Sequence, residues 1–457
     1  MGVLAVAAVS GALATRSAAR ERSYRLLIAS GEAALSSGET LAAIESFSGA
    51  IAVRPDAMLA RLRRGDTYRR RGDLDVAARD FRAASLLDPT ATRPLEGLAD
   101  VLYAQERFRR SADAYEARLT LDDRSAPIRY KLALAHYRDG AVDAALDEAR
   151  RAVALDDQLA DAHYLIALCL RDKGLPEDAV AALRRAIERA PGMLPAREEL
   201  ADLYAASGRF TEQLEQLQVL AGLDTRRAER QVAIGLAQAR AGRAELAVAT
   251  LTAALDQATD QSPVNAALGR VWLQLAESRT DRPEAAGRAL EALERAASAL
   301  TSTSETKALY GRALAGSGQL DAAEQLFQQA IERYPIAPSA FRQLGLVADE
   351  LGHAAVARTA FMQYLSLAPT DPDAASFAAR IGALSLKLNE AAAALPWLQR
   401  ALAAKPDDLP VLTAMAEAQL LAGDAPSARR TLTHALALQP ANRELQRLDR
   451  RIRKAEG

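Results

Sequence analysis

The fold is decided by a stretch at residues 62–89, which reads LRRGDTYRRRGDLDVAARDFRAASLLDP. Its small, large and turn-forming residues recur every 34 residues along the 457-residue chain. Counted from Met58, six places of the repeat are marked by Gly65, Gly72, Ala77, Phe81, Ala84 and Pro89. In other copies the same places hold Gly31, Gly38, Ala43, Phe47, Ala50 and Pro55, or Gly311, Gly318, Ala323, Phe327, Ala330 and Pro335. The chain is therefore an array of about twelve similar units.

The spacing of these marks predicts two helices in each unit. Gly72, at place fifteen, can reach the positive φ that ends a helix, and Pro89, at place thirty-two, cannot continue the next one. Small residues at places eight and twenty let the two helices approach closely, and the large residue at place twenty-four, here Phe81, fills the space beside them. We therefore expect one antiparallel helix pair in each unit.

The pattern is equally clear in residues 310–335, YGRALAGSGQLDAAEQLFQQAIERYP. This stretch and the one quoted above resemble the tetratricopeptide repeat family, and the resemblance extends from Tyr24 to Asn442. It implies an all-α fold, a right-handed α-solenoid superhelix of about twelve antiparallel helix pairs. It also implies a concave groove, lined by the first helix of each pair, in which peptides or segments of partner proteins lie.

Composition and motifs argue against several other functions. The 58 basic and 59 acidic residues nearly cancel, so no overall field attracts nucleic acid or an anionic membrane. The lone cysteine, Cys169, excludes an intrachain disulfide and is expected to be a small buried apolar residue. The histidines are scattered without ligand spacing, at His136, His163, His353 and His434. Because no phosphate loop or nucleophile elbow is present either, we predict that the protein is not an enzyme and uses no cofactor or metal.

The N-terminal residues 1–23 depart from the repeat. They begin with MGVLAVAAVSGALA, an apolar segment too short to span a membrane. Three interpretations are open: a signal peptide with a truncated start, a short membrane anchor, or an ordinary capping helix. Membrane contact is expected only through residues 1–14. The location follows from that choice, with the periplasm or cell envelope slightly favoured and the cytoplasm as the alternative.

The C-terminal residues 443–457 also depart from the repeat. Leu445, Leu448 and Ile452 share one helical stripe, and basic residues surround them. We predict a capping helix that covers the exposed apolar face of the last unit, as the ends of such arrays require. A basic interaction tail is the alternative.

Within the array, which spans residues 24–442, one unit at 262–300 is longer than its neighbours. There the sequence ESRTDRPE lengthens the turn between the two helices, so we predict a loop that bulges from one edge, with a hinge between two half-arrays as the alternative. Three bulky residues also occupy places where alanine is usual. We predict a local change of superhelical pitch near Arg118, Gln213 and Leu220.

One face of each first helix is a candidate binding surface. Places two, five, nine, twelve and thirteen lie opposite the places that face the core. In the second to fifth units they carry tyrosine, arginine and aspartate, and tyrosine and arginine often dominate the energetics of interfaces. The candidate residues are Asp66, Arg69, Arg70, Asp100, Tyr103, Tyr130, Tyr137, Arg138, Tyr164 and Arg171. The later units are blander, with Val232, Ala308, Ala315, Ala379, Ala383 and Thr413.

Together these features predict a non-enzymatic scaffold or adaptor that binds a peptide or helix of a partner protein, of the kind that assists assembly of an envelope or secretion complex. One alternative is an RNA-binding helical-repeat protein, although its basic groove is not apparent here. Another is a soluble cytoplasmic regulatory repeat protein. Place nine is never asparagine, which disfavours the chaperone-binding type of groove found in the family that the chain resembles. The partner and the oligomeric state are not specified by the sequence.

Overall fold

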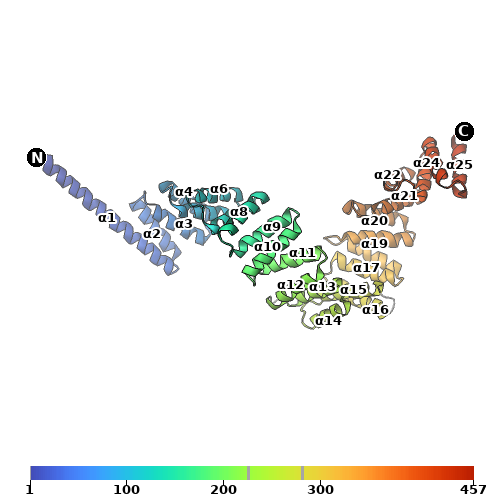
Figure 1. The fold of residues 1–457 in the computed structure, drawn as a ribbon, viewed down its shortest axis with the longest axis horizontal. Coiled ribbons are helices and arrows are strands. Elements are labelled where there is room, and N and C mark those ends of the chain that lie inside the picture. The colour runs from blue at the N-terminus through green and yellow to red at the C-terminus, as the bar shows by residue number, and fades with distance from the viewer. Residues whose placement is uncertain (1, 224–226, 279–282, 457) are drawn as a thin grey trace. The chain divides into compact units, whose positions relative to one another are not determined.

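The computed structural model describes residues 2–223, 227–278 and 283–456 (Figure 1). In these residues every regular element is a helix, and the 25 helices form twelve consecutive pairs followed by one last helix. The prediction of an all-α array of about twelve helix pairs is confirmed.

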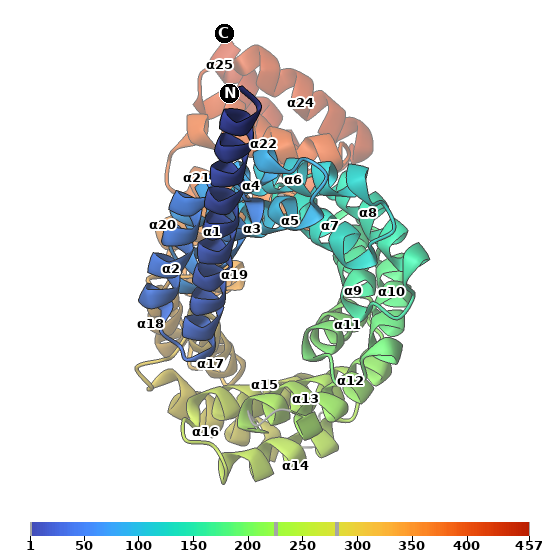
Figure 2. The ribbon, with the colours of Figure 1, turned by 90° about the vertical axis from the view of Figure 1, so that its left-hand side faces the viewer.

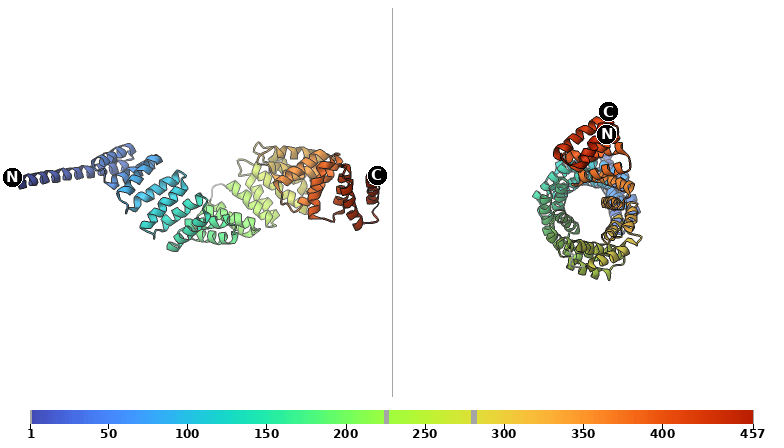
Figure 3. Two further views of the ribbon diagram at one scale, coloured as in Figure 1. Left: turned by 90° about the horizontal axis from the view of Figure 1, so that it is seen from above. Right: turned by 90° about the vertical axis from the view of Figure 1, so that its right-hand side faces the viewer.

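The chain divides into two compact units, unit 1 at Met1–Gln216 and unit 2 at Leu217–Gly457. Successive helix pairs are visible within each unit in Figure 3. Unit 1 contains α1 (Gly2–Ser36), α2 (Thr40–Val53), α3 (Met58–Arg71), α4 (Leu74–Leu87), α5 (Thr92–Ala104), α6 (Phe108–Leu121), α7 (Ala126–Arg138), α8 (Val142–Leu155), α9 (Ala160–Asp172), α10 (Pro176–Arg189), α11 (Leu194–Ala206) and the start of α12 (Phe210–Leu223). The helices of unit 2 are α13 (Arg227–Arg240), α14 (Ala244–Leu255), α15 (Ser262–Ser278), α16 (Glu284–Ala297), α17 (Ser304–Gly316), α18 (Leu320–Ile331), α19 (Pro338–Glu350), α20 (Ala354–Leu367), α21 (Ala374–Lys387), α22 (Ala391–Ala404), α23 (Leu409–Leu421), α24 (Ala425–Leu438) and α25 (Arg443–Glu456).

The turn inside each pair depends on the backbone conformation at place fifteen. Gly72 has φ of 89°, and the next amide, that of Asp73, donates to the carbonyl of Tyr68 at 2.9 Å, which closes the end of α3. Among the described residues, every positive φ falls at this place. Two of these positions are not glycine: Glu106 has φ of 58° and Asn389 has φ of 61°. The left-handed turn is therefore a property of the repeat even where the residue that favours it is absent.

The two helices of a pair interlock through the residues at places eight and twenty-four. A Cβ atom added to Gly345 would lie 2.5 Å from the ring of Phe361, too close for any side chain. Phe81 is enclosed on two sides, because a Cβ on Gly65 would lie 3.1 Å from its ring and one on Gly97 of the next repeat 2.6 Å. The aromatic ring thus packs directly on the helix backbone, and it is place twenty-four, more than place twenty, that covers the glycine.

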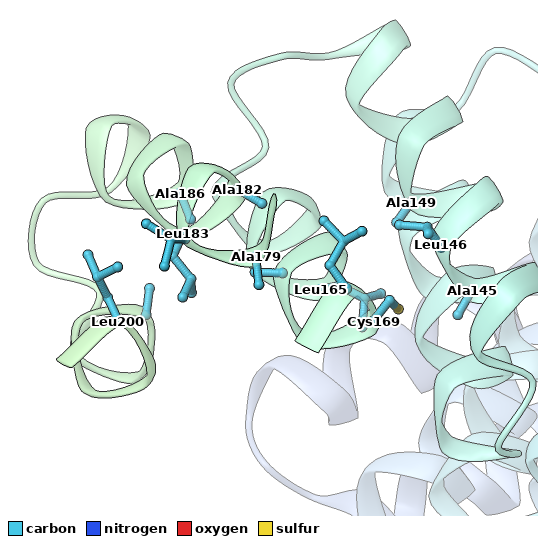
Figure 4. Close-up of a cluster of buried hydrophobic side chains, with 14 of the residues drawn as sticks. Ala145, Leu146, Ala149, Leu165, Cys169, Ala179, Ala182, Leu183, Ala186 and Leu200 are labelled. Carbon is cyan, nitrogen blue, oxygen red and sulfur yellow. The ribbon is translucent and has the colours of Figure 1, made fainter. Parts of the chain in front are cut away.

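Leucine replaces phenylalanine at place twenty-four in the fifth repeat. Leu183 of α10 is fully buried with Leu200 of α11, and Leu165 and Cys169 of α9 point toward Leu146 of α8 (Figure 4). Burial raises the pKa of the Cys169 thiol to about 11, so the thiol stays protonated at neutral pH. The prediction that Cys169 is a small buried apolar residue is confirmed.

The two ends of the chain are helical. α1 runs without a break from Gly2 to Ser36, and its residues Tyr24 and Ile28 are buried in the first core cluster. In α25, Leu445 and Ile452 are fully buried with Leu412 and Leu432 of the last helix pair. No helix within the described ranges is both long enough and apolar enough to cross the membrane.

Only some of the sequence irregularities, the long repeat and the three bulky residues, lie within the described residues. The long repeat is formed by α15 and α16, and most of its predicted bulging turn, residues 279–282, lies outside the described residues. Arg118, Gln213 and Leu220 are all buried, so the core accommodates these larger side chains. The guanidinium of Arg118 donates a hydrogen bond to the Asp122 carboxylate at 3.1 Å, which balances its positive charge. The proposed change of pitch near them stays a prediction.

Candidate protein-binding faces

The first helices of the repeats form the inner face of each unit. Within unit 1, α3 contacts α5 and α7 contacts α9, and within unit 2 α15 contacts α17 directly. Figure 2 shows α5, α7, α9 and α11 on the inner side of the curve of unit 1, with α6, α8 and α10 outside them. The ten predicted binding residues all lie on these inner helices, on α3, α5, α7 and α9.

Asp100 on α5 is the centre of a charged network that joins three inner helices of unit 1. It accepts hydrogen bonds from Lys131 of α7 at 3.0 Å and from Arg69 of α3 at 3.3 Å. The hydroxyl of Tyr115 donates to it at 2.5 Å. Burial opposes the charge of Lys131, but its hydrogen bonds to Glu96 and Asp100 outweigh burial and raise its pKa. Arg69 and Asp100, both predicted to contact a partner, therefore already bind each other within the chain.

A second network joins α7, α9 and α11. The hydroxyl of Tyr137 donates to Asp172 at 2.8 Å, and Arg171 donates to Glu199 at 2.8 Å and to the Tyr137 oxygen at 3.3 Å. Burial and the hydrogen bond to Asp172 raise the pKa of Tyr137 to about 12. These contacts fix the predicted residues Tyr137 and Arg171 in one orientation, so their polar atoms are positioned before any partner arrives.

Between the two networks lies a strip of four half-buried side chains, which we call the inner strip: Tyr130, Leu134, Tyr164 and Leu168. They occupy places five and nine of neighbouring repeats, on α7 and α9. Burial raises the pKa of Tyr130 to about 12 and that of Tyr164 above its usual value. The strip offers apolar and aromatic area with two hydroxyl groups, and charged residues bound it on either side.

The remaining predicted residues contribute less to this arrangement. Arg70 and Arg138 are exposed at the C-terminal ends of α3 and α7. Tyr103 packs its ring edge-on against Phe108, with 5.3 Å between the ring centroids, which gives it a structural role in its own repeat. The structure therefore groups the predicted residues into two charged networks and one aromatic strip, with Arg70, Tyr103 and Arg138 outside them.

An acidic group on α11 follows the second network. Glu198 and Asp202 occupy the inner places five and nine, and Glu199 beside them pairs with Arg171. Burial, followed by the charges of Glu199 and Glu198, raises the pKa of Asp202. Its charged form is therefore disfavoured in the free protein, a condition that a basic group of a partner would relieve.

The inner face of unit 2 is lined by ion pairs that connect one repeat to the next. Arg270 of α15 pairs with Glu305 of α17 at 2.7 Å, and Arg312 of α17 pairs with Glu277 of α15 at 2.5 Å. These two pairs border a cavity of about 350 Å³, whose lining includes Leu273, Gln274, Ala308, Leu309, Ser339 and Gln343. A second hollow of about 680 Å³ lies along α21, α23 and α25, where Arg451 pairs with Glu417 at 2.9 Å.

The inner face of unit 2 therefore carries ion pairs and a cavity that its small residues alone do not suggest. Ala308, one of the alanines predicted to make this face featureless, lines the cavity because its small side chain leaves the space unfilled. Leu134 and Leu168 were likewise absent from the predicted set, although place nine supplies both Asp66 and Asp100 and could have identified them. In the ranges that the structure describes, no three His, Cys, Asp or Glu residues are arranged to hold a metal ion.

The sequence matches family models of one helical repeat. The family model for the tetratricopeptide repeat matches residues 28–91, 97–160, 164–228, 309–372 and 342–408, and a second model of the same repeat matches 385–452. No curated protein matches the chain.

Several solved structures are similar to parts of the chain at low identity. The MamA protein is 21% identical over 37% of this chain and 92% of its own, with a TM-score of 0.36. YrrB, described as a TPR protein with an unusual peptide-binding site, is 20% identical over 42% of this chain and 98% of its own, with a TM-score of 0.36. A tetratricopeptide repeat protein from Parabacteroides merdae is 17% identical over 55% of this chain and 99% of its own, with a TM-score of 0.41.

The repeat models cover well over half of the chain, and the helix pairs, the left-handed turns and the interlocked glycines agree with them. The chain belongs to the tetratricopeptide repeat family.

Proposed function

We propose that the protein is a non-enzymatic scaffold that binds an extended or helical segment of a partner protein along the inner face of unit 1. The inner strip on α7 and α9 carries this proposal. Its aromatic and leucine side chains are half-buried, so a partner can remove further apolar area from water without first unfolding anything.

The charges around the inner strip define the partner's chemistry further. A segment with an apolar residue over Tyr130 and Tyr164 would meet the acidic group at Glu198 and Asp202 at one end. A basic residue placed there would lower the free energy of ionised Asp202. The preferred ligand is therefore a segment with an apolar centre and a lysine or arginine about three repeats from the Asp100 network.

A site-specific photo-crosslinker tests the location of the binding face. It is placed at Leu134 on the inner strip and, as the matched control, at Leu86 on α4, whose side chain is 76% exposed. In the native cells, the proposal expects proteins that crosslink from position 134 and not from position 86. Identical sets from the two positions, or none from position 134, would contradict it.

A pair of variants then measures the energy of the contact with any protein so identified. Tyr130→Ala combined with Tyr164→Ala should weaken binding by at least about tenfold, because buried tyrosines often contribute more than 1 kcal/mol each. The control is Tyr334→Ala, at a tyrosine that is 89% exposed. Circular dichroism of each variant shows whether the helices are retained.

A further inference from the structure

The last helix, α25, has two opposite faces with different roles. Leu445, Leu448 and Ile452 are spaced three and four residues apart, and all three are buried against the last helix pair. This apolar face already anchors the helix to the array. The opposite face is exposed and is available to a partner.

Four cations lie along that exposed face, which we call the basic stripe: Arg443, Arg447, Arg450 and Lys454. Their spacing of four, three and four residues places them within a narrow arc of the helix. All four are exposed, and none forms an ion pair with a residue of the described ranges. The neighbouring basic residues differ, because Arg451 pairs with Glu417 at 2.9 Å and Arg453 with Asp449 at 2.7 Å.

This helix carries an excess of positive charge. Residues 443–454 contain six basic and two acidic residues, a local net charge of +4 in a chain whose net charge is −1. Cations near the C-terminal end of a helix are stabilised by its dipole, but this effect falls off within the last turn. It accounts for Lys454 and does not account for Arg443 or Arg447, which lie at and one turn from the start of α25.

We propose that the basic stripe binds an extended acidic segment of a polypeptide. Along the helix axis the cations are separated by about 6, 4.5 and 6 Å. Alternate residues of an extended chain lie about 6.6–6.8 Å apart on one side, within about 1 Å of the first and third spacings. The long side chains of Arg447 and Arg450 can span the larger difference at the middle spacing. Arginine supplies a planar fork of donors for each carboxylate.

Two other anionic partners fit the helix less well. A membrane surface would gain only electrostatic attraction, since the apolar face of α25 is already buried and cannot insert. A nucleic acid strand usually stacks its bases on aromatic side chains, and residues 443–456 contain none. The inference does not depend on the binding face proposed for unit 1.

Fluorescence anisotropy with the full chain tests the proposal. The probe is a labelled peptide of about eight residues in which glutamate and serine alternate, matched to the length of the stripe. Arg447→Glu combined with Arg450→Glu should weaken its binding by at least about tenfold, because two attractions become repulsions. The control is Arg109→Glu with Arg110→Glu, an equal charge change at two exposed residues of α6, which should leave the affinity within about twofold.

Further probes separate the proposal from its competitors. Replacing the glutamates by glutamine should abolish binding, and grouping them in one block should weaken it. The proposal is overturned if both charge-reversed proteins lose affinity equally, or if no saturable binding occurs in the unmodified chain. It is also overturned if vesicles of phosphatidylserine and phosphatidylcholine, or a single-stranded oligonucleotide, bind the stripe more tightly than the peptide.

Discussion

The inner faces of unit 1 and unit 2 are built on one repeat and differ in chemistry. In unit 1, α7 and α9 present Tyr130 and Tyr164 with leucines beside them. In unit 2, α15 and α17 present two reciprocal arginine–glutamate pairs around a cavity. The residues that pack the two helices of each repeat together are similar in both units. The residues at the inward-facing places differ between the units.

The first prediction concerns the buried aromatic residue at place twenty-four, which should stabilise the repeats of both units to a similar extent. Phe81→Ala in unit 1 and Phe327→Ala in unit 2 each remove a fully buried ring that packs on a glycine. Each should lower the stability of its own repeats by about 3–5 kcal/mol. Hydrogen exchange followed by mass spectrometry reads out each repeat separately, and a large loss in only one unit would break the comparison.

A second test concerns ion pairs inside a repeat. In unit 1, Arg64 donates to both oxygens of Asp80 at 2.7 and 2.8 Å, and Asp80 is only 4% exposed. Asp80→Asn should cost about 2 kcal/mol, because it weakens two charge-assisted hydrogen bonds around a half-buried arginine. Urea unfolding followed by circular dichroism measures the loss, with the exposed Asp75→Asn as control.

The ion pairs between the repeats of unit 2 should matter much less for stability. Arg312→Gln breaks the pair with Glu277, but both side chains are more than one third exposed, at 39% and 49%. The expected loss is no more than about 1 kcal/mol, and it should shrink further in high salt. If the same unfolding measurement gave a loss as large as that of Asp80→Asn, the inner charges of unit 2 would be structural elements after all.

The smallest effect is expected at Asp202 of unit 1. Because the pKa of Asp202 is raised in the folded chain, the folded state favours its protonated form. Its contribution to stability is full below the ordinary pKa of 3.8 and is lost as the pH rises through the raised value. Asp202→Asn should therefore increase the Tm slightly at pH 7, and the difference should vanish in acid; a decrease at pH 7 would contradict the assignment.

The sequence was enough to predict the helices and their pairing. Glycine at place fifteen and the small-to-large pattern are local signals that act within one repeat, and the structure follows them closely. They fail only in detail, at Glu106 and Asn389, where the left-handed turn persists without glycine. Asparagine adopts this conformation more readily than most residues, whereas at Glu106 the surrounding helices impose it.

The inner faces were harder to predict, since their character depends on pairs of residues about one repeat apart. Arg69 and Asp100 could be assigned to the same face, but their mutual hydrogen bond could not be read from either helix alone. The cavity beside Ala308 is not predictable from one helix for a related reason, because a small side chain gives no sequence signal of the space beside it.

The ion pairs between inner helices also bear on how the array assembles. Tandem repeats with nearly identical cores can dock on the wrong neighbour, or on the same element of a second chain, at little cost in packing. Asp100 meets Arg69 on one side and Lys131 on the other, and Arg171 meets Glu199. If α7 took the place of α5, Arg69 would face Leu134 in place of Asp100 and the match would be lost. These charges therefore favour the native order of the repeats.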